Sequence, residues 1–138
     1  MKILDRSLEM SHSLLPGEYN SRVKYRTYHF SFIWRRNKLL ATGINGTVES
    51  PKCVKMGQTF NSSYFKEYPY VHAEIDAISK LWGRTNICSS LSMVVIRLNI
   101  RGELMESRPC QHCMPVLAKL GLTKKLFYSS KGRIVSVE

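Results

Sequence analysis

Several features that define other protein classes are missing from this chain of 138 residues. No apolar run approaches the roughly 20 residues that cross a bilayer, so we expect no membrane span. The sequence begins MKILDR and continues without the long apolar segment of a secretion signal, which leads us to expect a cytoplasmic protein. Internal repeats are absent as well, and the hydrophobic share of 43% is ordinary for a globular chain. We therefore expect a single domain over residues 1–138.

Acidic residues are scarce. The chain has 10 Asp and Glu against 21 Lys and Arg, which gives a formal net charge of +11. Such an excess favours anionic partners, either free nucleotides or single-stranded nucleic acid. The basic residues are spread along the chain and do not form a dense tail. A solvated basic surface without a ligand therefore explains the charge equally well, and both interpretations stay open.

Cysteine is also rare, with four in the chain: Cys53, Cys88, Cys110 and Cys113. Without a secretion signal, the even number does not predict disulfides, and we expect a reducing compartment. Cys110 and Cys113 form a Cys-x-x-Cys motif, which in an intracellular chain indicates metal or redox chemistry.

The spacing of apolar residues predicts the order helix, hairpin, helix, strand, helix, hairpin. Helical spacing covers residues 2–15, 72–82 and 110–120, and Leu4, Leu8 and Leu15 form the stripe of the first helix. Apolar alternation or continuous apolar runs predict strands over residues 28–34, 39–44, 91–100, 125–129 and 133–137. The last two strands are too close in sequence for a crossover helix, so we expect them to be antiparallel. The elements predict an α/β sandwich with one mixed sheet between helices.

Two short motifs carry the chemistry. His72 and Glu74 form a His-x-Glu at the start of one predicted helix, and Cys110 and Cys113 follow Pro109 at the start of another. Zinc prefers nitrogen and sulfur ligands, and catalytic zinc sites keep one of the four positions open. We therefore predict that His72, Cys110 and Cys113 bind Zn²⁺, with water in the fourth position. Glu74 is then free to move protons.

A structural zinc site is the alternative for the same residues. Its fourth ligand would be Cys53, Cys88 or His112, and Glu74 would have no catalytic part. Whether Cys53 or Cys88 binds a second metal is also open from the sequence.

A His-x-Glu followed by Pro-Cys-x-x-Cys is the signature of the zinc deaminases. On these residues the chain resembles the cytidine deaminase superfamily. Two further pieces, GINGT at residues 43–47 and YPYVHAE at residues 68–74, resemble deoxycytidylate (dCMP) deaminases and related phage-encoded enzymes. The resemblance implies a three-layer sandwich with a five-stranded mixed sheet flanked by helices, assembled as a homo-oligomer.

The same resemblance implies roles for individual residues. Asn45 would contact the base or sugar, and the backbone N–H of Ala73 would receive the pyrimidine carbonyl. Hydroxide would attack C4 of cytosine, while Glu74 protonates N3 and then the leaving amino group. From their own chemistry, Arg108 is a candidate for binding a phosphate and Tyr70 for stacking on the base, although a surface arginine and a core tyrosine are equally ordinary interpretations.

These observations favour an enzyme that converts cytosine to uracil in a free nucleotide or nucleoside, with dCMP as the favoured substrate. The alternative is a deaminase of cytosine or adenine within RNA or single-stranded DNA, which the net charge of +11 motivates. A third hypothesis is a catalytically silent zinc scaffold that binds a nucleotide or a partner.

Overall fold

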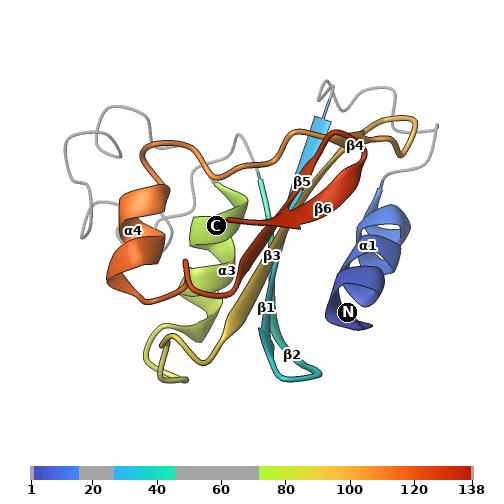
Figure 1. Ribbon diagram of the computed structural model, residues 1–138. Helices are drawn as coiled ribbons and strands as arrows, with labels where there is room; N and C mark the ends of the chain where they lie inside the picture. The colour runs from blue at the N-terminus through green and yellow to red at the C-terminus, as the bar shows by residue number, and fades with distance from the viewer. Residues whose placement is uncertain (1, 16–26, 46–71, 138) are drawn as a thin grey trace.

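The computed structural model describes residues 2–15, 27–45 and 72–137 (Figure 1). The helices are α1 (Lys2–Leu14), α3 (Ala73–Leu81) and α4 (Met114–Lys119). The strands are β1 (Thr27–Arg35), β2 (Lys38–Ile44), β3 (Ser92–Asn99), β4 (Leu104–Met105), β5 (Leu126–Ser130) and β6 (Arg133–Ser136). Within these ranges, no helix is both long enough and apolar enough to cross a membrane.

One mixed sheet joins all the strands. Its order is β2-β1-β3-β5-β6, with β1 antiparallel to both β2 and β3, and β3 parallel to β5. The predicted α/β fold class and the antiparallel pairing of the last two strands are confirmed. The sheet has a sixth strand, β4, which pairs with β3 outside the main order. Two residues are too few to show a strand period, so β4 could not be predicted from the pattern of apolar residues.

Helices cover both faces of the sheet, as predicted for a three-layer sandwich. In Figure 1, α1 lies on one side of the strands, and α3 and α4 lie on the other. The alternation along β1 explains the two cores, because successive side chains point to opposite faces. Phe30 and Trp34 pack in the cluster under α1, whereas Ile33 belongs to the cluster shared with α3 and α4.

The buried face of α1 differs from the predicted leucine stripe. Its fully buried residues are Ile3, Ser7 and Ser11, while Leu4, Leu8 and Leu15 are only partly buried. The reason is the indole of Trp34, whose Nε1 donates a hydrogen bond to Ser7 Oγ at 3.0 Å. A buried indole N–H needs an acceptor, and small serines also let the helix approach the sheet closely.

The third predicted helix begins later than expected. We predicted a helix from Cys110, but α4 begins at Met114, and residues 111–113 form a turn. The backbone N–H of Met114 still donates to the Cys110 carbonyl at 3.0 Å, so the turn leads directly into the helix. Pro115 lies near the start of α4, where its missing N–H costs no helical hydrogen bond.

A close contact fixes α3 against β2. A Cβ atom built on Gly43 would lie 2.0 Å from the Ala73 carbonyl oxygen and 2.5 Å from the Ala77 nitrogen. The side chain of Asp76 adds a second link, because its Oδ2 accepts a hydrogen bond from the Ile44 N–H at 2.9 Å. Together these contacts place the start of α3, and therefore His72, at the end of β2.

The Gly43→Ala variant tests this contact. The added methyl group collides with backbone atoms, which cannot rotate away as a side chain can. We expect a loss of roughly 1–3 kcal/mol in the free energy of unfolding, or more if α3 cannot shift. Urea denaturation measures it, and Gly132→Ala is the control because that position has open space around it. If Gly43→Ala is as stable as the unaltered protein, the close packing is contradicted. Gly132→Ala should lose only the free energy that an alanine costs at a positive φ.

Candidate metal centre

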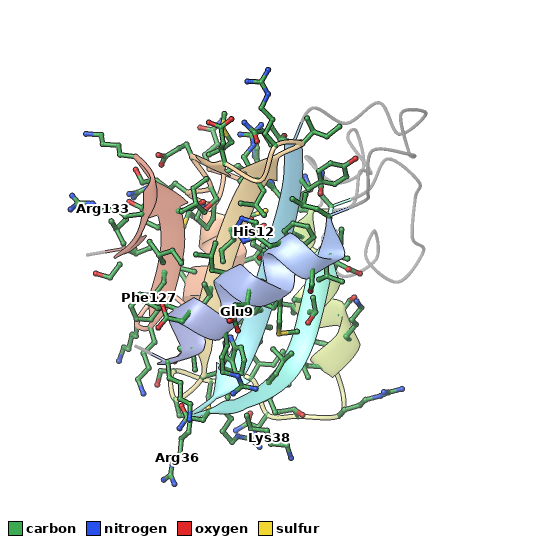
Figure 2. All side chains as sticks on the ribbon, turned by 90° about the vertical axis from the view of Figure 1, so that its right-hand side faces the viewer. Glu9, His12, Arg36, Lys38, Phe127 and Arg133 are labelled. Carbon is green, nitrogen blue, oxygen red and sulfur yellow. The ribbon has the colours of Figure 1, made fainter. Side chains whose placement is uncertain are left out.

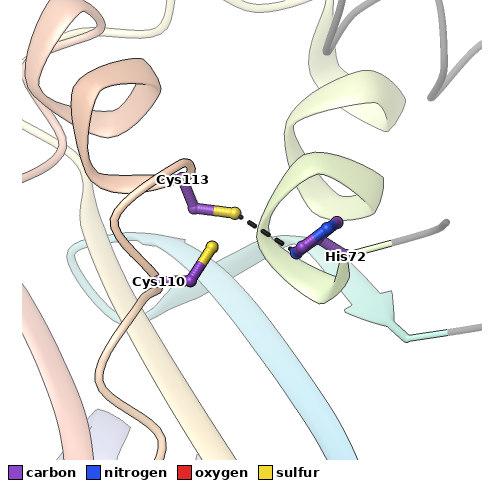
Figure 3. A group of neighbouring side chains, drawn as sticks. All are labelled: His72, Cys110 and Cys113. Atoms are coloured by element: carbon purple, nitrogen blue, oxygen red, sulfur yellow. Dashed lines mark hydrogen bonds between the residues drawn. The ribbon is translucent and has the colours of Figure 1, made fainter. Parts of the chain in front are cut away.

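Three metal-binding side chains converge from two separate parts of the chain (Figure 3). His72 immediately precedes α3, whereas Cys110 and Cys113 belong to the turn before α4. Their donor atoms all lie within 4.8 Å of one another. Cys113 Sγ lies 3.5 Å from His72 Nδ1. The structure therefore brings together the three residues that the two sequence motifs selected.

Buried serines hold the chain segment that leads to Cys110. Ser107 Oγ donates a hydrogen bond to the Val95 carbonyl at 2.7 Å, and the Ser129 N–H donates to Ser107 Oγ, also at 2.7 Å. The Ser107 N–H in turn donates to the Ser129 carbonyl at 2.9 Å. Because Val95 lies on β3 and Ser129 on β5, this network ties the approach to the cysteines to the centre of the sheet.

The two cysteines differ in their electrostatic surroundings. A hydrogen bond from the Cys113 thiol, with others from His72 and from nearby backbone N–H groups, lowers the pKa of Cys110 from 9.0 to about 3. The same contact with Cys110, together with burial, raises the pKa of Cys113 well above its usual value. The hydrogen bond to Cys110 also raises the pKa of His72. One thiolate is thus favoured at this position even before any cation is considered.

This donor set suits zinc. One imidazole and two thiols match the ligands of tetrahedral zinc sites, and three protein donors leave one position open. Among the residues that the structure describes, this is the one group of three or more His, Cys, Asp or Glu with metal-binding geometry. Cys88 does not belong to this group of ligands. Its Sγ lies 3.0 Å from Ser90 Oγ. Cys53, the other candidate for a fourth ligand, lies outside the described residues.

Glu74 lies next to the three donors and is not one of them. It occupies the second position of α3, and only 4% of its surface is exposed. Burial raises the pKa of its carboxyl group, and the Cys113 thiol is near enough to interact with it. A buried carboxyl group beside a metal-binding group can accept and release protons near neutral pH, which is what general acid–base catalysis needs.

The predicted substrate-binding residues have separate surroundings. The Oδ1 of Asn45 accepts a hydrogen bond from the His29 N–H at 2.9 Å, and the Asn45 N–H donates to the His29 carbonyl at 3.2 Å. Ala73 is fully buried at the first position of α3. Arg108 is exposed, and its Nη1 donates to Tyr128 Oη at 3.3 Å. Tyr70 lies outside the described residues.

Sequence reasoning missed two residues near the centre, His29 and Arg97. They are cross-strand partners on β1 and β3. His29 is close enough to His72 and Cys110 for each to affect its pKa. Strand alternation shows which face a residue takes and not what lies above it, so the sequence alone did not indicate that His29 lies near the two motifs.

Comparison with known proteins agrees with this arrangement. No protein-family model and no curated protein matches the sequence. Among solved structures, cytidine deaminase from Mycobacterium tuberculosis matches with a TM-score of 0.50 and 17% identity, over 98% of this chain and 88% of that chain. A mutant of that enzyme matches with a TM-score of 0.51 and 14% identity, over 98% of this chain and 86% of the other. The chain has the cytidine deaminase fold. The fold predicted from the two motifs is thereby confirmed.

Metal analysis tests the centre of this cytidine deaminase fold directly. We expect one zinc ion per chain after reconstitution, measured by elemental analysis. Replacing His72 with Ala, or Cys113 with Ser, should weaken zinc binding by more than the roughly 10–100-fold that loss of an outer contact costs. Cys88→Ser is the matched control and should bind zinc as the unaltered protein does. Equal zinc content in all four proteins would rule out these ligands.

The half-buried histidine on β1 predicts a pH dependence of stability. Burial, reinforced by the charge of Arg97, lowers the pKa of His29 from 6.5 to about 4. Between these values the unfolded chain binds the proton more readily, so the free energy of unfolding should fall as the pH decreases through this window. The expected loss is up to about 3 kcal/mol. Urea titrations of metal-free protein should show a flatter pH profile for His29→Gln; parallel profiles would contradict the assignment.

Proposed function

We propose that this chain is a zinc-dependent hydrolytic deaminase that converts cytosine to uracil in a free nucleotide or nucleoside, with dCMP as the favoured substrate. The observation that carries the proposal is the juxtaposition of His72, Cys110 and Cys113 with the buried carboxyl group of Glu74, within the cytidine deaminase fold. A structural zinc site needs no buried carboxyl group that stays outside the ligand set. The arrangement therefore favours catalysis over a purely structural role.

His72, Cys110 and Cys113 would hold the zinc ion. Bound there, zinc supplies a water molecule of lowered pKa as the nucleophile for C4 of the ring. Cys110 already favours the thiolate, which is the form that binds metal. Two thiolates and a neutral imidazole would leave the centre with no net charge.

Glu74 would move the protons. Its carboxylate would take a proton from the attacking water and deliver it to N3 of the ring. It would then take the proton of the new hydroxyl group at C4 and pass it to the amino group, which leaves as ammonia. Burial supports this role, because it raises the pKa of the carboxyl group and so favours its protonated form, from which a proton can be donated. Water is consumed, ammonia is released, and cytosine becomes uracil.

Asn45 and Ala73 would place the pyrimidine. The backbone pair with His29 orients the Asn45 side chain, because its oxygen is already used as an acceptor. Its amide N–H groups are then the ones available to a base or sugar. Ala73 contributes a backbone N–H from the first turn of α3, where helix N–H groups have no partner within the helix.

A second candidate is a deaminase acting on single-stranded nucleic acid. A cavity of about 470 Å³ between α1 and the β1–β2 turn is lined by basic and polar residues that include Lys2, Arg36 and Lys125. Figure 2 shows Arg36 and Lys38 extending away from the sheet at this turn. Bound phosphates there would make affinity fall steeply with salt. Oligonucleotide binding that does not depend on salt, or absent editing of a cytosine-containing strand, removes this candidate.

Replacement of Glu74 tests the leading proposal. Zinc-loaded protein should convert dCMP with loss of cytosine absorbance and release of ammonia. In Glu74→Gln, kcat should fall by roughly 10²–10⁴-fold while the zinc content stays unchanged. Glu9→Gln is the control, since Glu9 is exposed on α1 on the far face of the sheet (Figure 2).

Two results would count against the proposed enzyme. If zinc-loaded protein converts none of dCMP, deoxycytidine and cytidine, the deaminase proposal fails and a silent zinc scaffold is favoured. If Glu74→Gln turns over substrate as fast as Glu9→Gln does, another group must move the protons.

A further inference from the structure

An imidazole and a guanidinium near the metal-binding group each have a buried nitrogen without a hydrogen-bond partner among the described residues. His29 on β1 and Arg97 on β3 are direct partners in the antiparallel ladder. Their neighbours in each strand, Phe30 and Ile96, pack under α1, so His29 and Arg97 point to the opposite face, where α3 and the cysteines lie. His72 and Cys110 both act electrostatically on the His29 ring.

Arg97 is half-buried and has no carboxylate partner among the described residues. Its Nη2 donates to Thr27 Oγ1 at 3.1 Å, and its Nη1 donates to the Glu106 carbonyl at 3.4 Å. Both acceptors are uncharged, and the buried Nε has no partner. The ion pair between Lys80 and Asp76, within the described residues, does not involve Arg97. A guanidinium removed from water in this way normally faces an anion.

The imidazole ring of His29 also has an unsatisfied nitrogen atom. Its backbone is fully used, since the N–H and the carbonyl both bind Asn45. Its Nε2 is buried and has no hydrogen-bond partner in the part of the chain that the structure describes. Unsatisfied buried polar atoms are uncommon in folded proteins and call for an explanation, of which a missing ligand is one. Here the two unsatisfied atoms occur on directly paired residues next to a candidate metal centre.

We propose that Arg97, with His29 beside it, binds the phosphate group of a nucleotide substrate whose base lies at His72, Cys110 and Cys113. The proposal rests on the deaminase function above and narrows its substrate from nucleoside or nucleotide to nucleotide. Phosphate fits because its oxygens accept hydrogen bonds from the planar guanidinium and carry the charge that Arg97 lacks nearby. Arg108, the residue that the sequence suggested for phosphate, instead contacts Tyr128, with its guanidinium 5.7 Å from the ring centre.

Steady-state kinetics with dCMP and deoxycytidine test this assignment. The unaltered zinc-loaded protein should prefer dCMP. In Arg97→Gln, KM for dCMP should rise by about 10- to 100-fold, because a hydrogen-bonded charge contact is lost, while kcat/KM for deoxycytidine stays within about twofold. Arg97→Lys should restore part of the preference, since the charge remains without the planar fork. His29→Leu should raise KM for dCMP by a smaller factor.

Arg101→Gln is the matched control. Arg101 is an exposed arginine in the turn just beyond β3, and its backbone N–H donates a hydrogen bond to Asn99 Oδ1. This variant should keep the preference for dCMP. Arg108→Gln distinguishes the two candidate arginines. If Arg108→Gln loses the preference for dCMP and Arg97→Gln keeps it, the assignment of the phosphate site to Arg97 is overturned.

The remaining outcomes separate the phosphate site from the deaminase function. If the unaltered enzyme converts deoxycytidine as well as dCMP, the phosphate site is wrong and the deaminase stands. If Arg97→Gln loses both substrates equally or unfolds at a much lower temperature than Arg97→Lys, Arg97 has a structural role. If no substrate is converted, calorimetric titration of zinc-loaded protein with dCMP tests the phosphate site by itself. If Arg97→Gln binds dCMP as tightly as the unaltered protein does, the proposal is overturned.

Discussion

The close approach of α3 to β2 is the constraint on which the candidate site depends. The carbonyl of Ala73 and the backbone nitrogen of Ala77 occupy the space that a side chain at Gly43 would need. Because β2 is hydrogen-bonded to β1, this contact sets the position of α3 relative to the whole sheet. His72 and Glu74 then take their places through the geometry of a single helical turn. A small residue in the sheet thus determines where an imidazole and a carboxyl group lie.

Much of this arrangement was predictable because periodicity and motif spacing are local properties. The alternation of β1 assigned Phe30 and Ile33 to opposite cores, and the continuous apolar run of β3 indicated a central strand. The two motifs also selected the residues that converge, since each precedes a helix. In contrast, α1 buries Ser7 and Ser11 because of a tryptophan far away in sequence. No pattern within α1 itself contains that information.

The surroundings of the charged residues could not be predicted from local sequence patterns either. A net charge of +11 says nothing about which arginine is half-buried and which is exposed. Arg108 adjoins the cysteine motif in sequence, yet it is directed at Tyr128 on β5. Arg97 lies on β3, whose apolar sequence is typical of a core strand. Its cross-strand partner His29 lies 68 positions earlier in the sequence. Sheet register brings these two together, and register across non-adjacent segments is the property that a single sequence specifies least clearly.

The two halves of the metal-binding group are anchored independently. His72 is positioned through α3 and β2, whereas Cys110 and Cys113 follow a segment tied to β3 and β5 through Ser107 and Ser129. An ion held by both halves would close a loop between residues 41 positions apart. Its binding free energy would then become folding free energy, shared between the β2 end and the β3–β5 part of the sheet. Metal occupancy and the cooperativity of unfolding would rise and fall together.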